Sequence, residues 1–295
     1  MKNILIGLVF SILWASAAVA TKFGVLSASP LILANIRFFI AGLLLLSFTY
    51  AFKRGEGYRL PTRREFIQLG IFGFLNTTLY LGLYVFAMKY TAAGIGSLAT
   101  SINPLLIVVF SALWLRRKPS KQELLSVFLG MLGIGIASYP SLNDSHSTLG
   151  GLVLLISSMI VVSIASVYYS SIRWSLANLL INGWQVTIAG FLLLPFTLLL
   201  SDFTAIKWDV NFWGSVLWLS IAVSIVGLIC WFHLLRIDAV KASLWLFLCP
   251  LFGFFFAWML MNEPITGFTV IGTVLVILSL YLGQRQRQLV AASRK

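Results

Sequence analysis

Residues 93–104 read AGIGSLATSINP, and residues 239–250 read AVKASLWLFLCP. The two stretches lie 146 positions apart, and each runs from small residues to a proline within an apolar region. The aligned pairs are Phe86 and Phe232, Ala93 and Ala239, Ser97 and Ser243, Leu98 and Leu244, Pro104 and Pro250, and Leu105 and Leu251. A short charged turn precedes each stretch, and a Lys-Pro or Glu-Pro pair follows it. This shared order predicts an internal repeat.

The composition around the repeat is that of a membrane protein. Of the 295 residues, 60% are hydrophobic and only 10% are charged, and the mean hydropathy is +0.98. A helix of about 20 mainly apolar residues crosses the hydrocarbon core of a bilayer. Ten such runs occur, at residues 3–22, 30–52, 66–88, 91–115, 122–140, 148–171, 176–200, 212–235, 239–261 and 266–284. We therefore predict an all-α membrane protein with ten transmembrane helices.

The repeat divides these helices into two related halves. We expect residues 1–142 and 148–285 to form one five-helix repeat each, and residues 286–295 to form a cytoplasmic basic tail. Because five is an odd number, the second half must enter the membrane from the opposite side, which makes the repeats inverted. Inverted repeats are typical of secondary transporters, whose similar halves open a central cavity first to one side and then to the other.

The basic residues predict the orientation. The chain has 21 Lys and Arg against eight Asp and Glu, a net charge of +13. Seventeen of the 21 lie in the terminal segments and loops on the side of the amino terminus, whereas Lys22, Lys89 and Lys207 lie on the other side. Basic loops stay in the cytoplasm. We expect a multi-pass protein of the inner membrane with both termini cytoplasmic, and no nucleic-acid partner.

The first span resembles a secretory signal peptide. Lys2, an apolar stretch and Ala18-Val19-Ala20 imitate its charged start and small-residue cleavage site. Cleavage would leave nine spans. Because the repeat needs the first helix, we expect this span to stay in the protein.

The two aligned prolines, Pro104 and Pro250, fall inside predicted spans. Proline leaves the carbonyl group four residues earlier without its helical partner. In a membrane such a break must face a cavity or packed protein. We expect the two prolines to mark helix breaks that line a cavity and take part in gating. The alternative is a pair of kinks that only shape the bundle.

Several polar residues inside the spans are candidates for substrate binding. Arg37 is the only full charge clearly within a predicted span, and its planar fork suits a carboxylate or phosphate. The alternative is that it reaches toward the membrane surface or bonds to backbone carbonyls. Asn76 and Tyr80 lie one turn apart, and Asn103 precedes Pro104, so they can share one cavity. Each could equally hold helices together.

Aromatic and titratable residues complete the candidate site. Trp14 with Ser16, Tyr168 and Trp245 could form its walls, although many aromatic residues instead sit at membrane interfaces. His233 could carry a proton or simply pack. No Asp or Glu lies at mid-depth in a predicted span, which disfavours a carboxylate relay for protons. The two cysteines lie in apolar stretches, so we expect no metal and no cofactor.

As a set, these motifs resemble the EamA branch of the drug/metabolite transporter superfamily. They are Leu13-Trp14-Ala15-Ser16, Asn35-Ile36-Arg37-Phe38, the run Ala92 to Pro104, the run Ala239 to Pro250, and Asn262-Glu263-Pro264. The likeness covers nearly the whole chain, but Arg117-Lys118-Pro119 stands where the family often has Glu-Pro or Glu-Arg-Pro. The resemblance implies a central cavity built mainly by spans one, three, four, six, eight and nine, and export of amino acids or related metabolites.

We therefore expect a secondary transporter, independent of ATP, that exports amino acids, with aromatic or hydrophobic ones favoured, by alternating access. It would be no enzyme, and its partners would be a small-molecule substrate and the lipid bilayer, as a monomer or homodimer. The first alternative is a carrier of cationic or amphipathic drugs or quaternary amines, held in an aromatic cage. A remote alternative is a membrane enzyme acting on lipids, which would need a cluster of Asp, Glu or His.

Overall fold

The computed structural model describes residues 2–53, 55–114, 121–143, 147–237 and 245–292. This part of the chain is helical and contains no strand. The long elements are α1 (Lys2–Ser27), α2 (Pro30–Phe52), α3 (Arg63–Gly73), α4 (Tyr80–Lys89), α5 (Ala93–Ala99), α6 (Asn103–Trp114), α7 (Lys121–Asn143), α8 (Leu149–Ser171), α9 (Asn178–Leu200), α10 (Val210–Leu217), α11 (Leu228–Ile237), α13 (Cys249–Met261) and α14 (Gly267–Ala292). A short turn, η1 (Glu56–Tyr58), lies in the loop after α2.

The described helices are those of a multi-pass membrane protein. Seven continuous helical segments are long and apolar enough to cross a bilayer: Asn3–Ser27, Pro30–Phe52, Arg63–Lys89, Ala93–Trp114, Leu149–Ser171, Asn178–Leu200 and Val210–Leu234. Three shorter apolar helices are Leu124–Ala137, Cys249–Met261 and Gly267–Ser279. The all-helical membrane class is confirmed, whereas the count of ten spans and the inverted arrangement stay predictions. Helix α14 runs on to Ala292 and so takes in most of the segment predicted as a tail.

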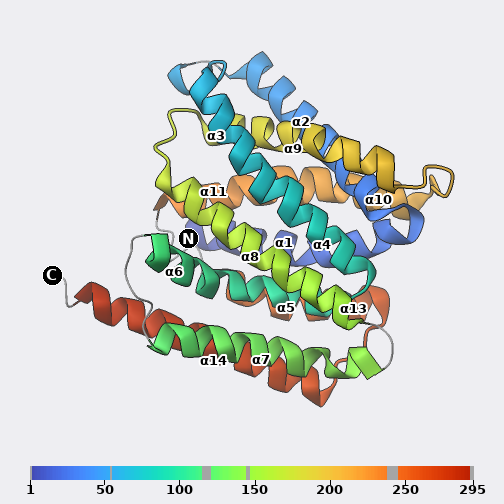
Figure 1. The fold of residues 1–295 in the computed structure, drawn as a ribbon, viewed down its shortest axis with the longest axis vertical. Coiled ribbons are helices and arrows are strands. Elements are labelled where there is room, and N and C mark those ends of the chain that lie inside the picture. The colour runs from blue at the N-terminus through green and yellow to red at the C-terminus, as the bar shows by residue number, and fades with distance from the viewer. Residues whose placement is uncertain (1, 54, 115–120, 144–146, 238–244, 293–295) are drawn as a thin grey trace.

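Helices that are distant in the sequence pair side by side. Helix α7 packs along α14 at one edge of the bundle, and α2 packs along α9 at the opposite edge (Figure 1). Between these edges, α5 packs on α13, α4 on α8, and α1 on both α10 and α13. Helix α1 therefore contacts elements from both halves of the chain.

Four of the membrane segments are not regular α-helices throughout. Between α3 and α4 lies the π-helical segment η2 (Phe74–Leu79), and between α10 and α11 lies a second one, η4 (Trp218–Gly227). Two 3₁₀ segments, η3 (Thr100–Ile102) and η5 (Trp245–Leu248), end directly before α6 and α13. Pro104 and Pro250 are the second residues of these two helices, so the helix geometry changes where the prolines occur.

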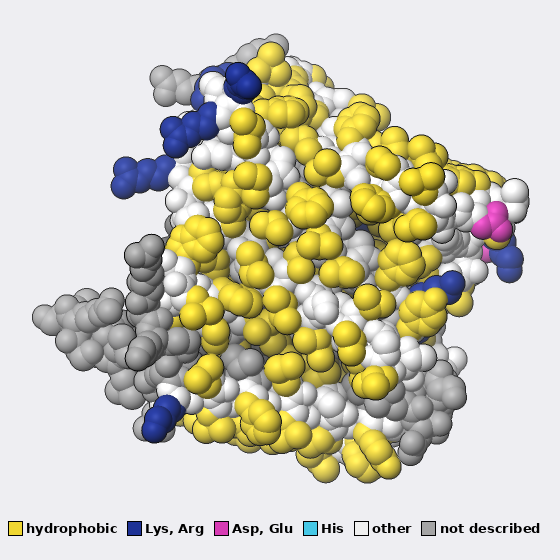
Figure 2. Space-filling view, viewed as in Figure 1, with side chains coloured by type: hydrophobic (Ala, Val, Ile, Leu, Met, Phe, Trp, Pro, Cys, Tyr) yellow, Lys and Arg dark blue, Asp and Glu magenta, His cyan; other side chains and the backbone are white. Residues whose placement is uncertain are grey.

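The outer surface of the bundle suits a bilayer. Large hydrophobic side chains such as Leu43, Phe191 and Leu199 are exposed, and Figure 2 shows hydrophobic groups over much of the middle of the visible face. Lys and Arg lie instead toward the ends of the bundle, several of them at the end where α3 begins (Figure 2). Arg59 and Arg63 are exposed. An apolar belt between polar ends is the expected surface of a membrane-spanning bundle.

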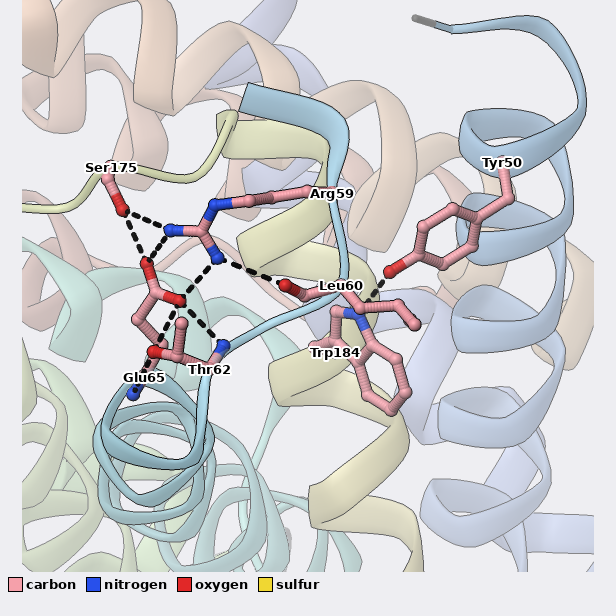
Figure 3. A network of polar contacts seen from close by, with 7 residues as sticks. All are labelled: Tyr50, Arg59, Leu60, Thr62, Glu65, Ser175 and Trp184. Carbon is pink, nitrogen blue, oxygen red and sulfur yellow. Dashed lines mark hydrogen bonds and ion pairs between the residues drawn. The ribbon is translucent and has the colours of Figure 1, made fainter. Parts of the chain in front are cut away.

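At this polar end one network joins the loop after α2 to the loop after α8 (Figure 3). Arg59 holds Glu65 through two hydrogen bonds of 2.8 Å, and Glu65 also accepts from Ser175 in the second loop. Thr62 and Glu65 form a capping box at the start of α3. Trp184 donates to the hydroxyl of Tyr50 at 2.9 Å nearby. The two loops are thus tied together by side chains.

Candidate functional site

A cavity of about 350 Å³ lies at the centre of the bundle. Six of the residues predicted for the site line it: Trp14, Arg37, Asn76, Tyr80, Asn103 and Pro104. They come from α1, α2, η2, the start of α4 and the start of α6. Six other elements contribute lining residues, among them α8, α9, η4 and α11. Segments far apart in the sequence therefore meet at one site.

Arg37 is the one charged side chain among the described residues that line this cavity. Its side chain is 4% exposed, and its Nε donates to the hydroxyl of Ser224 in η4 at 2.9 Å. The Arg37 carbonyl accepts from the Ser220 hydroxyl at 3.2 Å, one turn earlier in the same segment. Among the described residues, no hydrogen-bond partner takes the two terminal nitrogens of Arg37. Ser224 thus holds the guanidinium group through its Nε atom. The two terminal nitrogens, the open fork of Arg37, are left to bind another group.

A chain of amide side chains continues from Ser224. Asn182 donates to the Ser224 carbonyl at 2.9 Å, and Gln185 donates to the Asn182 side-chain oxygen at 3.1 Å. The hydroxyl of Thr77 in η2 donates to the Gln185 side-chain oxygen at 2.6 Å. The chain therefore connects the two π-helical segments through α9. Segments of this kind occur frequently at functional sites.

Asn103 provides a buried polar group without a partner. Its side chain is 7% exposed, and its Oδ1 accepts no hydrogen bond from the described residues. A buried amide oxygen that lacks a donor is costly. Asn76 makes only a long contact of 3.4 Å to Thr77. Both amides can therefore bond to a molecule in the cavity.

Aromatic rings form much of the wall. Phe10 stacks on Trp231 with ring centroids 4.9 Å apart and lies 5.5 Å from Trp14. Tyr169 also stacks on Phe232, with ring centroids 5.6 Å apart. All five residues line the cavity. The site can thus hold an apolar or aromatic group beside one cationic fork.

The other predicted residues lie outside this lining. Ser16 accepts a hydrogen bond from the Trp218 indole at 2.8 Å in a separate apolar groove. Tyr168 packs partly buried beside the cluster of Leu69 and Phe72, and Trp245 packs against α1 near Phe10. His233 is exposed on α11, and Pro250 is buried at the start of α13.

Sequence reasoning missed Ser224, Tyr169 and Phe10, which carry no distinctive motif. Tyr169 directly follows the predicted Tyr168, and only the helix rotation decides which of the two faces the cavity. Ser224 is four residues from Ser220 in a run of apolar residues. That spacing marks one helix face and could have drawn attention to it.

Comparison with known proteins identifies the family. The model of the EamA-like transporter family matches residues 1–139 and 149–283. The chain is 27% identical to an uncharacterized transporter of Archaeoglobus fulgidus, over 93% of this chain and 95% of that one. It is 28% identical to the uncharacterized transporter YvbV of Bacillus subtilis, over 92% and 88%.

Two further proteins are similar over most of their length. Protein PecM of Dickeya dadantii is 26% identical, over 92% of this chain and 88% of that one. One solved crystal structure shares the fold over 98% of both chains, with a TM-score of 0.67 and 18% identity. The predicted resemblance is confirmed: the chain belongs to the EamA-like transporter family, and it is a membrane transporter, not an enzyme.

Proposed function

We propose that this transporter exports amino acids, with aromatic or hydrophobic side chains favoured, by alternating access through the central cavity. The observation that carries the proposal is the open fork of Arg37. A buried cation without a counter-ion is costly, and no described residue that lines the cavity is an Asp or Glu. A substrate carboxylate supplies the missing negative charge, and it can bind the fork through two parallel hydrogen bonds.

The rest of the cavity suits the other parts of an amino acid. The unpartnered Oδ1 of Asn103 can accept a hydrogen bond from the α-ammonium group. The rings of Phe10, Trp14 and Trp231 offer an apolar wall for a large side chain. The volume of about 350 Å³ falls within the usual range for small-molecule sites. In this proposal Asn76 and Tyr80 add polar contacts to the bound substrate.

The pairing of helices supports two exchangeable halves. If residues 1–142 and 148–285 are inverted five-helix repeats, then α2 and α9 are equivalent helices, as are α7 and α14. These are the helices that pack side by side, and α5 and α13, which belong to the equivalent fourth and ninth predicted spans, also pack together. Such pairing is expected around a two-fold axis in the membrane plane. The distribution of basic residues supports a location in the inner membrane with both termini in the cytoplasm.

A carrier of organic cations is the second candidate, because the stacked rings could hold a quaternary amine. Arg37 would repel such a ligand, so the carboxylate reading is preferred. Counterflow in liposomes separates the two. We expect labelled phenylalanine to accumulate in liposomes preloaded with unlabelled phenylalanine, and external phenylalanine to compete.

The competitor series makes this test specific. Phenylalanine amide, which lacks the carboxylate, should compete at least tenfold more weakly, and a choline-like cation should not compete. If no amino acid is carried while the cation is, the proposal is wrong. Protein-free liposomes and liposomes that contain the Arg37→Gln variant serve as controls.

A further inference from the structure

The two ends of the central cavity differ. At one end its lining reaches Ser111, Ser166 and Ser170, whose side chains are partly or fully exposed. Toward the opposite end, Tyr84 and Ile95 are each no more than 4% exposed and belong to the main hydrophobic core. The structure is therefore closed at the end of the bundle where α5 begins. The orientation proposed above makes this the outer end.

A carboxylate from the other half of the chain lies at this closed end. Glu263 follows α13, after Asn262 in the left-handed conformation with φ 54°. Its Oε1 accepts from the backbone N–H of Ala93 at 2.7 Å, and its Oε2 accepts from Gly94 at 3.0 Å. The first N–H groups of a helical span have no partner within the helix. Charge-assisted bonds of this kind are about twice as strong as neutral ones.

The segment just before α5 is held by other contacts as well. The N–H of Ala92 donates to the Ser147 hydroxyl at 2.9 Å, and the N–H of Thr148 donates to the Tyr90 carbonyl at 2.8 Å. Lys22 of α1 donates to the Thr91 carbonyl. Glu263 differs from these groups because it joins α5 to the turn between α13 and α14. No other hydrogen bond between described residues does so.

Helices α5 and α13 are also packed too closely to slide past one another. A Cβ atom added at Gly94 would lie 2.3 Å from the Phe254 ring, and one added at Gly253 would lie 2.0 Å from Ser97 Cβ. Opening of the cavity between these two helices therefore requires them to separate. Separation breaks both hydrogen bonds of Glu263.

We propose that Glu263 is a gating residue, whose carboxylate closes the outer end of the cavity by tying the start of α5 to the turn after α13. The bonds are made in the closed state and must break when that end opens. The proposal rests on alternating access, as proposed above, but not on the identity of the substrate.

Comparison of the two predicted repeats indicates that only the second half supplies a carboxylate for such a contact. In the first half, Lys118-Pro119 stands in the place of Glu263-Pro264. Lys118 lies outside the described residues, but a lysine side chain only donates hydrogen bonds and cannot accept from backbone N–H groups. Lys118 can therefore not accept the hydrogen bonds that Glu263 accepts. The protein should rest with its outer end closed.

Distances between spin labels at this end test the proposal. Cysteines replace the exposed residues Lys89 and Ile265 in a background without Cys230 and Cys249, and both are spin-labelled. The Glu263→Gln variant keeps the shape and loses the charge, and Glu263→Ala removes the acceptor. We expect both variants to shift the population toward longer distances, with a larger shift for Glu263→Ala.

Conservative and remote variants control this experiment. Glu263→Asp keeps the carboxylate and should restore most of the short distance, which a merely structural loss would not do. Asp202→Asn removes an exposed acid from another loop and should leave the distances unchanged. Identical distance distributions in the parent protein, Glu263→Gln and Glu263→Ala would overturn the proposal. The measurement needs no substrate, so its outcome is independent of the amino-acid assignment.

Discussion

Arg37 combines two properties that rarely occur together in a membrane protein, a buried charge and unpaired terminal nitrogens. It is a permanent cation 4% exposed among helices, and its terminal nitrogens have no partner among the described residues. A cation that only held helices together would bond to carbonyls or to an acid. Here a single neutral hydroxyl, that of Ser224, orients the group. Arg37 is therefore arranged to receive an anion.

Substitution of Arg37 should weaken substrate binding more than stability. A hydrogen bond to a charged group contributes about 1.5–3 kcal/mol, which corresponds to roughly a 10- to 100-fold change in Kd. We expect Arg37→Gln to raise the Kd for phenylalanine by that factor and Arg37→Lys to raise it less, because lysine keeps the charge but loses the fork. The measurement is the ligand-induced rise in the melting temperature. Arg173→Gln, at an exposed position, should bind normally.

Asp209 predicts how the stability of the protein depends on pH. It precedes α10 and accepts from the Phe212 N–H at 2.9 Å and from the Ser27 hydroxyl at 3.0 Å. These bonds, the first above all, lower the pKa of Asp209 from its ordinary value. Because the pKa is lower in the folded state, the stabilisation is present above about pH 4 and is lost as the pH falls through the folded-state pKa.

We therefore expect Asp209→Ala to lower the melting temperature by a few degrees at pH 7. The difference from the parent protein should shrink as the pH falls below about 4. Asp209→Asn keeps a capping acceptor and should lose less at pH 7. A difference that stayed constant from pH 7 to pH 3 would rule out this role for the carboxylate.

At the scale of the elements, glycines allow α7 and α14 to touch. A Cβ added at Gly272 would lie 2.4 Å from the Gly133 carbonyl and 2.6 Å from Ala137 Cβ. The backbone carbonyl of Gly133 cannot move aside as the end of a flexible side chain can. The small residues therefore set the distance between these two helices, as is common in membrane proteins.

Gly272→Ala should destabilise the protein by about 1–3 kcal/mol, because the added methyl group forces the helices apart. Gly135→Ala on α7 is the matched control, since a Cβ there meets nothing within 4 Å. Thermal unfolding in detergent compares the two. Equal melting temperatures for both variants would show that the α7–α14 contact is looser than described.

The sequence predicts where the membrane helices lie better than it predicts where their geometry departs from a regular α-helix. Apolar runs predict the bounds of the seven long membrane segments among the described residues to within a few residues, because the bilayer fixes the length of a helix. The π-helical segments η2 and η4 carry no sequence signal, since they depend on contacts such as Thr77 with Gln185. The same limit applies to the site. Arg37 stands out in the sequence because a charge in a span is rare, whereas the sequence does not tell which way the side chains of Ser16 and Trp245 face.

At the scale of the whole molecule, the transporter has a central cavity whose two ends differ. The contact of Glu263 with α5 explains why one end is closed, and its long sequence separation explains why spacing alone did not predict it. The Arg59–Glu65 network joins loops at the other end (Figure 3). A carrier of this kind must expose the same cavity residues to both sides of the membrane in turn.

Accessibility of a single cysteine from both sides tests this claim most directly. Val186→Cys lies in the lining of the cavity, away from the exposed serines at its open end, and Cys230 and Cys249 are replaced by alanine so that no other thiol reacts. A membrane-impermeant maleimide is added from either side of sealed vesicles, with and without phenylalanine, to protein that retains counterflow. We predict labelling from both sides, in proportions that the substrate changes. Labelling from one side only under every condition would contradict alternating access.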